Sequence, residues 1–283
     1  MRINKLFSNY GICSRSETNR LIEEGRVKVN GKSAVLGQWV EESDTILLDG
    51  FTVKKSEKLY FAFNKPVGIV CTNSKDVNNN IIDYINYNKY IFPVGRLDKD
   101  SEGLIIMTND GEYSNKLINS DEMHEKEYIV TLDKSINEDF IKNMESGVYI
   151  KNKKSSGIHR ISDTKGIKKI VDNSGNAYYE EELIKNIAKN KRQDKIKSRP
   201  CKCYIINEHT FGIILTQGLN RQIRKMCSAL GYEVVNLKRI RIANINLGNL
   251  MCGELKILDK KIIEEFLWEC DKQKSIASLE EER

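Results

Sequence analysis

Apolar and polar positions in the first fifty residues predict two helices followed by a hairpin. Ser14-Arg15-Ser16-Glu17 has the spacing of a capping box, which starts a helix, and Gly25 is expected to end it. An earlier helix is expected over about residues 3–9. Residues 26–29 alternate polar and apolar side chains before Asn30-Gly31, a strong signal of a tight hairpin. Together with a strand over residues 44–48, these elements predict a small domain over residues 1–50.

The remainder of the chain is rich in predicted strands, and a polar stretch over residues 51–58 is expected to link it to the first domain. Apolar runs bounded by turn residues predict strands over residues 59–63, 69–72, 103–108, 126–132, 201–206, 210–216 and 234–247. Helical spacing predicts helices over residues 81–85, 111–118, 138–145, 220–230 and 260–270. Strands without a regular β-α-β alternation favour an α+β fold with a mixed or antiparallel central sheet.

Two segments depart from this pattern. Residues 151–198 are rich in Lys, Asn, Ser and Asp, with a stretch over residues 178–190 capable of forming a helix. We interpret them as an insertion in a domain that spans residues 59–270. Residues 271–283 form a polar tail that is expected to fray.

Composition indicates a protein that folds in water. Its 283 residues suit two domains, and 40% of them are hydrophobic while 30% are charged. No apolar run approaches the roughly 20 residues of a membrane span, and the N-terminus lacks the apolar stretch of a signal peptide. We therefore expect a cytoplasmic protein without a membrane partner.

The seven cysteines are scattered, which fits reduced thiols better than a disulfide framework. Cys201 and Cys203 would share one face of a strand, and His209 is the one further ligand type close by. Structural zinc takes four ligands, so we expect no metal site.

Positive charge is clustered along the chain, although the net charge is only +6. Lys and Arg outnumber acids by seven to three in residues 1–35, by eight to one in residues 185–202 and by six to one in residues 221–241. Such clusters suggest a polyanionic partner. We predict that the second of them contacts RNA, with an effect on which substrate fits as the alternative. The alternative for each stretch is an ordinary solvated surface.

Asp98, taken alone, looks like part of a solvated turn, but the run around it is distinctive. The run Phe92-Pro93-Val94-Gly95-Arg96-Leu97-Asp98 continues through Ser101-Glu102-Gly103 to Gly111 and resembles the catalytic motif of RNA pseudouridine synthases. Three further matches to that family follow its order: Asn64-Lys65-Pro66-Val67-Gly68, His124-Glu125-Lys126-Glu127-Tyr128, and Gln217-Gly218-Leu219-Asn220-Arg221-Gln222-Ile223-Arg224-Lys225-Met226.

The amino-acid sequences of these motifs are most similar to those of the RluF type within the RsuA, RluB, RluE and RluF branch. Residues 2 to about 50 resemble the small RNA-binding module first described in ribosomal protein S-four. The resemblance implies an S-four-like domain followed by a synthase domain that isomerises uridine to pseudouridine in large-subunit ribosomal RNA. The reaction loses no group and needs no cofactor.

The resemblance also implies a role for three side chains. Asp98 would be the nucleophile, which either adds to an electron-poor carbon or assists removal of the C2′ proton. Arg224 would be the cation that keeps this carboxylate ionised where burial alone would raise its pKa. Tyr128 would pack on the flipped uracil, with core packing as the alternative. Arg221 and Arg224 are expected to share one face of the helix predicted over residues 220–230.

The remaining candidates bind RNA or support the site. Those expected to contact RNA are Arg96, Arg221, Lys225, Arg2, Lys5, Arg15, Arg20, Arg26 and Lys28. Those expected to give structural support are Lys65, Pro66, Gly95 and Leu97. We expect the protein to act as a monomer.

Other functions stay open at this point. The same chemistry could act on a transfer RNA anticodon or on small-subunit RNA, and a ribosome-binding or assembly factor could keep both folds without turnover. A binding-only protein has no need of Asp98, Arg224 and Tyr128 together, which favours the enzyme. A glycosidase using Asp98 and Asp100 is disfavoured, because two carboxylates in one turn do not flank a scissile bond.

Overall fold

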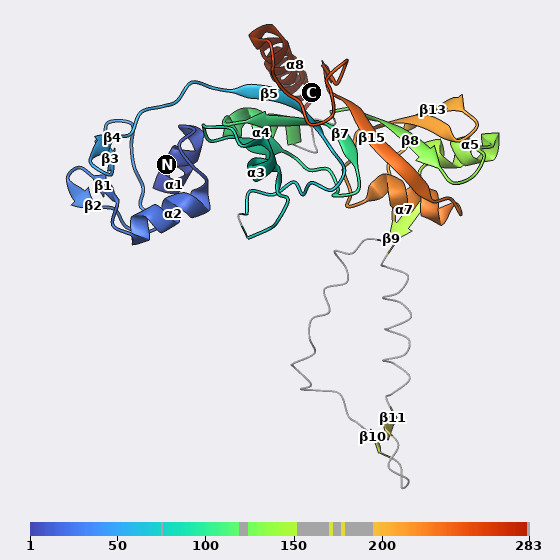
Figure 1. Ribbon diagram of the computed structural model, residues 1–283, viewed down its shortest axis with the longest axis horizontal. Helices are drawn as coiled ribbons and strands as arrows, with labels where there is room; N and C mark the ends of the chain where they lie inside the picture. The colour runs from blue at the N-terminus through green and yellow to red at the C-terminus, as the bar shows by residue number, and fades with distance from the viewer. Residues whose placement is uncertain (75, 119–123, 152–169, 172–176, 179–194, 282–283) are drawn as a thin grey trace. The chain divides into compact units, whose positions relative to one another are not determined.

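The computed structural model describes the chain except residues 75, 119–123, 152–169, 172–176, 179–194 and 282–283 (Figure 1). The described residues fall into two compact units, Met1–Ile129 with Asn236–Arg283, and Val130–Val235. Most of the insertion predicted over residues 151–198 lies outside the described residues. So does the helix predicted over residues 178–190, apart from Tyr178, which belongs to a short strand.

The first fifty residues form the helix pair and hairpin that the sequence predicts. Helices α1 (Ile3–Asn9) and α2 (Arg15–Glu23) pack against each other, and Ser14 Oγ caps α2 by accepting from the Glu17 amide over 3.1 Å (Figure 1). The adjoining sheet has the order β2-β1-β3-β4, with β1 at Val27–Val29, β2 at Lys32–Ser33, β3 at Ile46–Leu48 and β4 at Phe51–Thr52. The left-handed φ angles of +49° at Asn30 and +80° at Gly31 confirm the predicted hairpin.

This small sheet extends further than expected. Asp49 and Gly50 have φ angles of +51° and +85° and turn the chain back, so that β4 pairs antiparallel with β3. Phe51 and Thr52 therefore belong to the sheet, although they were assigned to the linker.

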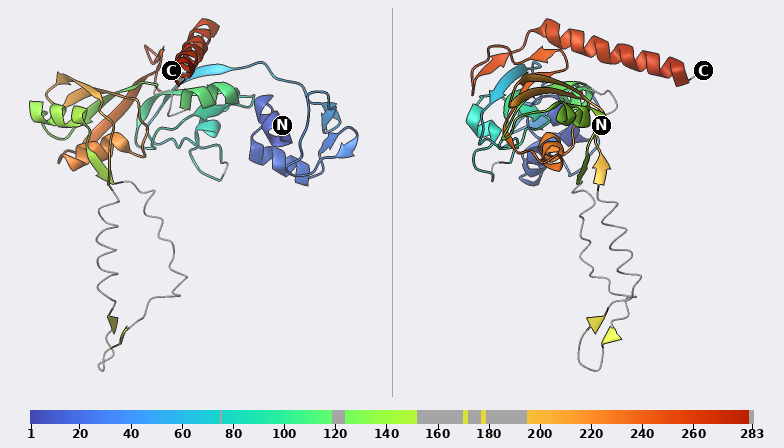
Figure 2. Two further views of the ribbon diagram at one scale, coloured as in Figure 1. Left: turned by 180° about the vertical axis from the view of Figure 1, so that it is seen from behind. Right: turned by 90° about the vertical axis from the view of Figure 1, so that its right-hand side faces the viewer.

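The rest of the first unit is built on a mixed sheet. Its strands are β5 (Tyr60–Lys65), β6 (Phe92–Val94), β7 (Glu102–Thr108), β8 (Lys126–Leu132), β15 (Val234–Ile242), β16 (Ile245–Asn246) and β17 (Leu255–Ile257). β7 pairs antiparallel with β5 and β6 and parallel with β15, which confirms the mixed sheet. Its helices are α3 (Ile81–Ile85), α4 (Gly111–Ile118) and α8 (Lys260–Glu281), the last a single long helix (Figure 2).

Successive side chains of β5 and β7 point to opposite faces of this sheet and build two cores. Ala62, Leu104 and Ile106 pack on one face with side chains of α4 and α8. Phe61, Phe63, Ile69, Ile81, Leu97, Ile105 and Met107 pack on the other, which also takes in α3. The continuous apolar run of β7 is explained by this burial on both faces.

The second unit holds shorter elements. They are α5 (Glu138–Ser146), β9 (Tyr149–Lys151), β10 (Ile170–Val171), β11 (Ala177–Tyr178), β12 (Lys195–Lys197), β13 (Lys202–Asn207), β14 (Thr210–Leu215) and α7 (Gln222–Ala229). Phe140 anchors their core, with its ring 5.2 Å from that of Phe211 and 4.4 Å from that of Tyr232. Within this unit β13 pairs antiparallel with β14, and β12 pairs antiparallel with β9.

Three local predictions were wrong, and some strands, such as β6 and β17, were not predicted. Residues 69–72 form no strand. The strand predicted over residues 234–247 ends at Ile242, because Ala243, with a φ of +48°, turns the chain into β16. α8 runs beyond residue 270 to Glu281, in keeping with the good helix formers there. None of the helices described is long and apolar enough to cross a membrane.

Candidate active site

Asp98 lies in the loop that joins β6 to β7. Because these strands pair antiparallel, residues 95–101 turn at one end of the pair. Gly95 begins the loop with a φ of +73°, a conformation that glycine adopts without strain. The Ser101 amide donates to the Asp98 carbonyl over 3.1 Å, which closes a turn. The side chain of Asp98 is partly buried and that of Arg96 is exposed, so one loop presents both.

Lys65 holds the backbone that supports this loop. Its side chain has no exposed surface, and Nζ donates to the carbonyls of Pro66 and Ile69 over 2.8 and 2.9 Å. The turn closed in this way contains Gly68, whose amide donates to the Lys99 carbonyl over 2.7 Å. The buried ammonium thus orders a turn that bonds the residue next to Asp98.

Leu97 and Tyr128 place the loop and β8 on the same core. Leu97 is 8% exposed and belongs to the cluster on the α3 face of the sheet. Its amide points to Cys71 Sγ at 3.4 Å. Tyr128, partly buried on β8, packs against the same cluster. The proposed nucleophile therefore neighbours a side chain that shares a core with the proposed base-stacking ring.

Arg239 is a buried cation that the sequence analysis did not single out. It lies on β15 opposite Gly103, is 4% exposed, and donates from Nε to the Leu104 carbonyl over 2.7 Å. Its guanidinium carbon lies 6.0 Å from the centre of the Tyr128 ring. The sequence held one indication of this burial. Arg239 lies two residues after buried Leu237, and side chains two apart on a strand point to the same face, so Arg239 could have been predicted to point inward.

Two acids of the β8 motif bind the next arginine of β15. Arg241 donates from Nη2 to Glu125 Oε2 over 2.8 Å and from Nε to Glu127 Oε2 over 2.7 Å. His124 packs on Phe266 of α8, with ring centres 4.9 Å apart. These contacts attach β8 to β15 and α8, which gives the motif a structural use.

Arg224 and its neighbours belong to the second unit. Arg224 Nη1 donates to the Val234 carbonyl over 2.9 Å, and both Arg224 and Lys225 are partly buried. Arg221 is exposed and precedes α7 with a left-handed φ of +52°. The prediction that Arg221 and Arg224 share a helix face was therefore wrong, because the helix begins only at Gln222.

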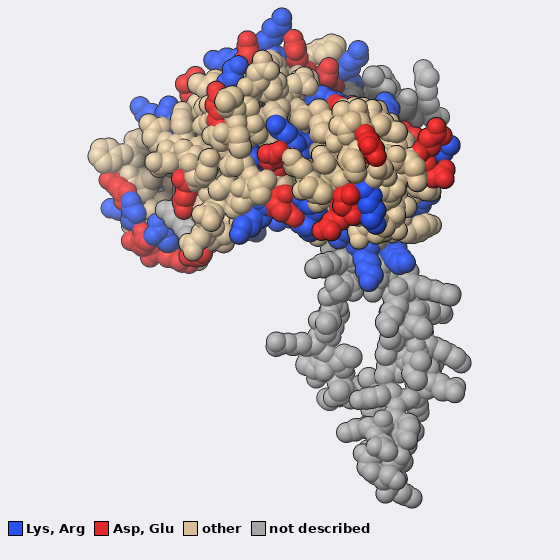
Figure 3. Space-filling view, turned by 45° about the vertical axis from the view of Figure 1, so that its right-hand side comes forward, with Lys and Arg blue, Asp and Glu red and all other residues tan. Residues whose placement is uncertain are grey.

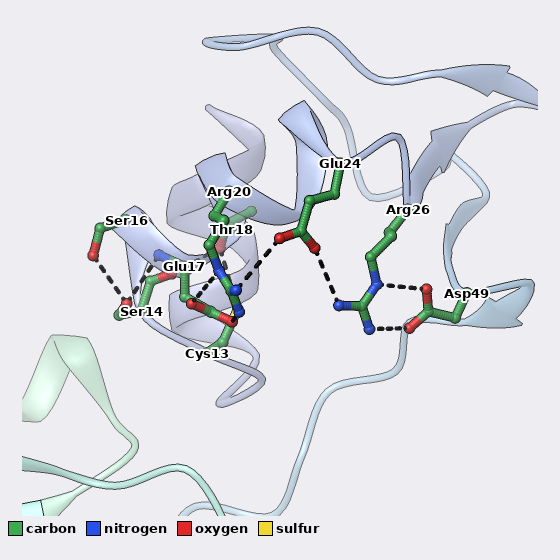
Figure 4. Close-up of polar contacts among 9 residues, drawn as sticks. All are labelled: Cys13, Ser14, Ser16, Glu17, Thr18, Arg20, Glu24, Arg26 and Asp49. Atoms are coloured by element: carbon green, nitrogen blue, oxygen red, sulfur yellow. Dashed lines mark hydrogen bonds and ion pairs between the residues drawn. The ribbon is translucent and has the colours of Figure 1, made fainter. Parts of the chain in front are cut away.

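The S-four-like module divides its basic side chains into two groups. Arg20 binds Glu17 and Glu24, at 2.5 and 3.3 Å, and Arg26 binds Glu24 and Asp49, at 3.3 and 2.6 Å (Figure 4). These bonds raise the pKa of Arg26 and lower that of Asp49. Arg2, Lys5, Arg15, Lys28 and Lys32 are exposed and form no ion pair with any described residue. The second group is better suited to bind RNA phosphates, because no ion pair with a described acid competes for its side chains.

Charge on the surface is mixed rather than continuous. On the face that Figure 3 shows, Lys and Arg side chains are interspersed with Asp and Glu side chains. Most of residues 185–202, predicted to contact RNA, lie outside the described residues.

No group of three or more His, Cys, Asp or Glu side chains within the described ranges is arranged to hold a metal ion. Cys201 and Cys203 lie with their Sγ atoms 3.9 Å apart.

Comparisons with known proteins show the family of this chain. The RNA pseudouridylate synthase family matches residues 59–229, and the S4 domain family matches residues 1–46. The chain is 39% identical over 272 residues to "Dual-specificity RNA pseudouridine synthase RluF" of Escherichia coli strain K12, covering 94% of this chain and 78% of that protein. It is 32% identical to "Ribosomal large subunit pseudouridine synthase B" of Bacillus subtilis strain 168, covering 91% of each chain.

A solved structure described as "Crystal structure of pseudouridylate synthase" superposes with a TM-score of 0.60 at 25% identity, covering 94% of this chain and 99% of that one. The resemblance seen in the motifs is thereby confirmed, as are the S4 module and the mixed-sheet synthase fold. The chain belongs to the RNA pseudouridine synthase family, and it carries an S4 domain ahead of the synthase domain.

Proposed function

We propose that Asp98 is the nucleophile of this RNA pseudouridine synthase and that Tyr128 holds the target base. The observation that carries the proposal is the shared support of the two residues. The Asp98 loop is hydrogen-bonded through Lys99 to the turn closed by Lys65, and Leu97 packs in the cluster on which Tyr128 packs. A carboxylate held by its backbone and a ring held by the same core keep a constant geometry, which nucleophilic catalysis on a flipped base requires.

The chemistry needs few groups. The enzyme breaks the N1–C1′ bond of uridine, turns the uracil and rejoins it through C5. Asp98 engages the substrate carbon, and a flat aromatic ring at Tyr128 lets the base turn without leaving. We assign Arg224 the part of the cation that keeps Asp98 ionised, on the strength of its motif. Lys65, Pro66, Gly95 and Leu97 shape the loop and take no chemical step.

We propose large-subunit ribosomal RNA as the substrate. The Bacillus subtilis relative is named for the large ribosomal subunit, and the Escherichia coli relative is named as dual-specificity, which supports a second RNA, with transfer RNA as our candidate. The S4 domain, whose sheet ends at Thr52, is joined by a linker to residues 59–270 and would bind phosphates through Lys5, Arg15 and Lys28. We infer a monomer that works in the cytoplasm, where these RNAs are made.

A deletion strain tests this function. Pseudouridines in ribosomal and transfer RNA are mapped by carbodiimide treatment and primer extension, with and without a plasmid carrying the wild type or Asp98→Asn. We expect a large-subunit signal that the wild type restores and Asp98→Asn does not, because an amide cannot replace the carboxylate nucleophile. The purified variant should lose at least about 10³-fold in rate while still binding RNA. Restoration by Asp98→Asn would refute the assignment of Asp98, and a signal lost only from another RNA would refute the substrate.

A further inference from the structure

Arg239 carries a buried positive charge that the structure only partly compensates. The side chain is 4% exposed, and Nη2 has no hydrogen-bond partner in the described part of the chain. No described carboxylate forms an ion pair with it either. Its polar contacts are the Leu104 carbonyl and the face of the Tyr128 ring. Burying a cation without a counter-charge is costly, so a purely structural position would favour an apolar side chain.

The surroundings of Arg239 are those of the proposed site. β15 runs parallel to β7 with Arg239 opposite Gly103, so the guanidinium lies at the start of β7, directly after the Asp98 loop. The pKa of Lys65 responds to the charges around it. Burial lowers this pKa, and the positive charge of Arg239 lowers it further. The carboxylates of Asp100 and Asp98 oppose the shift. Burial also lowers the pKa of Lys126, and Arg239 contributes again.

The backbones of β7 and β15 come close together at this point. A Cβ atom built on Gly103, whose φ is +106°, would lie 2.2 Å from the Arg239 carbonyl oxygen. Glycine at this position lets the backbones of β7 and β15 come close enough for the guanidinium to reach Leu104 and Tyr128. The position of the guanidinium is therefore set by backbone contacts and not by a flexible side chain alone.

The reaction generates the negative counter-charge that Arg239 lacks. When the N1–C1′ bond of uridine breaks, its electron pair leaves with the uracil, and the negative charge spreads over N1, O2 and O4. The charge disappears once C5 has bonded to C1′, C5 has lost its proton and N1 has gained one. A buried cation next to the ring that stacks the base stabilises this detached anion more than it stabilises neutral uridine, which is the condition for lowering the barrier.

We propose that Arg239 is a positioning residue of the site: it holds the Tyr128 ring and keeps a positive charge beside it that only the detached uracil compensates. This inference rests on the proposed function, since it needs Asp98 and Tyr128 in their assigned places. It assigns a task in the reaction to a β15 residue that lies outside the motifs around Asp98, Tyr128 and Arg224.

Three variants of the full-length enzyme separate charge from packing. Arg239→Met removes the charge and keeps the length, Arg239→Lys keeps the charge, and Arg241→Met is the matched control on the same strand. Each is measured for melting temperature, RNA dissociation constant and single-turnover rate on a large-subunit RNA fragment that the wild type modifies. We expect Arg239→Met to lose about 100-fold in rate with RNA affinity within about threefold of wild type. Arg239→Lys should keep most of the rate, and Arg241→Met should lower the melting temperature alone.

A double-mutant cycle with Tyr128→Leu tests the link to the ring. If Arg239 acts through Tyr128, the double variant Arg239→Met/Tyr128→Leu should be little slower than the slower single variant. Multiplicative losses, an Arg239→Met rate within about threefold of wild type, or an Arg239→Lys rate as low as that of Arg239→Met would each overturn the proposal. If Arg239→Met does not fold, Arg239→Gln, which also removes the charge, takes its place in the cycle, and again multiplicative losses refute the link.

Asp98→Asn in the same assay distinguishes a failure of the role inferred for Arg239 from a failure of the proposed function. An active Asp98→Asn enzyme would remove the proposed function together with this inference. An inactive Asp98→Asn enzyme beside a fully active Arg239→Met enzyme would remove the inference alone.

Discussion

The S4 domain and the synthase site both use basic residues, but they treat them in opposite ways. In the S4 domain the basic side chains are exposed, and those that have partners bind acids close by, as Arg20 binds Glu17 and Arg26 binds Asp49. In the synthase domain Lys65 and Arg239 are buried and bind backbone carbonyls. Exposed charges are screened by solvent and salt, so each contributes a small, separate increment to binding. Buried charges hold a fixed hydrogen-bonded geometry, so the loss of one disturbs the groups bonded to it.

This difference separates affinity from chemistry. A solvated cation near a phosphate contributes a salt-dependent increment of RNA affinity and carries no information about the base. A buried cation beside the Asp98 loop orders backbone that the reaction needs, and its loss is felt in stability or rate. Substitutions in the two regions test that contrast, beginning with the one expected to have the largest effect.

Gly103→Ala should cause the largest loss. The new methyl group would lie 2.2 Å from the Arg239 carbonyl oxygen, and alanine would have to adopt a φ of +106°. We expect a cost of about 3 kcal/mol or more in the free energy of unfolding, read from urea denaturation. Gly95→Ala is the matched control, because its φ is +73° and nothing lies within 4 Å of its Cβ position, so strain of about 1 kcal/mol is expected. Equal losses for the two variants would show that β7 and β15 do not depend on this close approach.

Asp110→Asn should have an intermediate effect that depends on pH. The Asp110 side chain is 5% exposed and accepts from Lys58 Nζ over 2.8 Å and from Tyr60 Oη over 2.7 Å. Burial tends to raise the pKa of Asp110, but the bonds from Lys58 and Tyr60 outweigh it and lower the pKa overall. A lowered folded-state pKa stabilises the fold above the unfolded value of about 4, and this stability is lost as the pH falls through the folded-state pKa.

We therefore expect Asp110→Asn to cost about 2 kcal/mol at pH 7. The difference in melting temperature between the wild type and Asp110→Asn should shrink below a pH of about 4. Thermal melts of both proteins across that range provide the measurement. A difference that stays constant down to pH 3 would contradict the assignment of this stability to the ionised carboxylate.

Single substitutions in the S4 domain should have the smallest effects. Lys5→Ala and Arg15→Ala should each weaken RNA binding a few-fold, uniformly across sequences, and reduce the slope of log Kd against log salt by about 1. Arg26→Ala is the control, since Arg26 already binds Glu24 and Asp49. Filter binding at several salt concentrations measures the slopes. A slope change at Arg26 as large as that at Arg15 would erase the distinction between paired and unpaired S4 cations.

Local signals accounted for much of the fold. The capping box at Ser14 and the Asn30-Gly31 turn predicted their elements because each acts through backbone bonds a few residues away. The same holds for α3, α4 and β8, whose observed bounds match the predicted ones. The turn at Ala243 escaped prediction because alanine rarely adopts a left-handed φ, whereas Asp49-Gly50 is a hairpin signal that the sequence analysis did not use.

The sequence alone determined the family and its reaction. Asp98, Tyr128 and Arg224 belong to motifs whose order along the chain and whose residues are specific to that family. The sequence also indicated a supporting role for Lys65, and the alternation along β15 indicated an inward Arg239, but neither signal showed which groups these buried cations would contact. The pairing of β15 with β7 buried Arg239 next to Tyr128, and the turn closed by Lys65 fixed the Asp98 loop. Only the tertiary structure decided this, because burial depends on strands that are far apart along the chain.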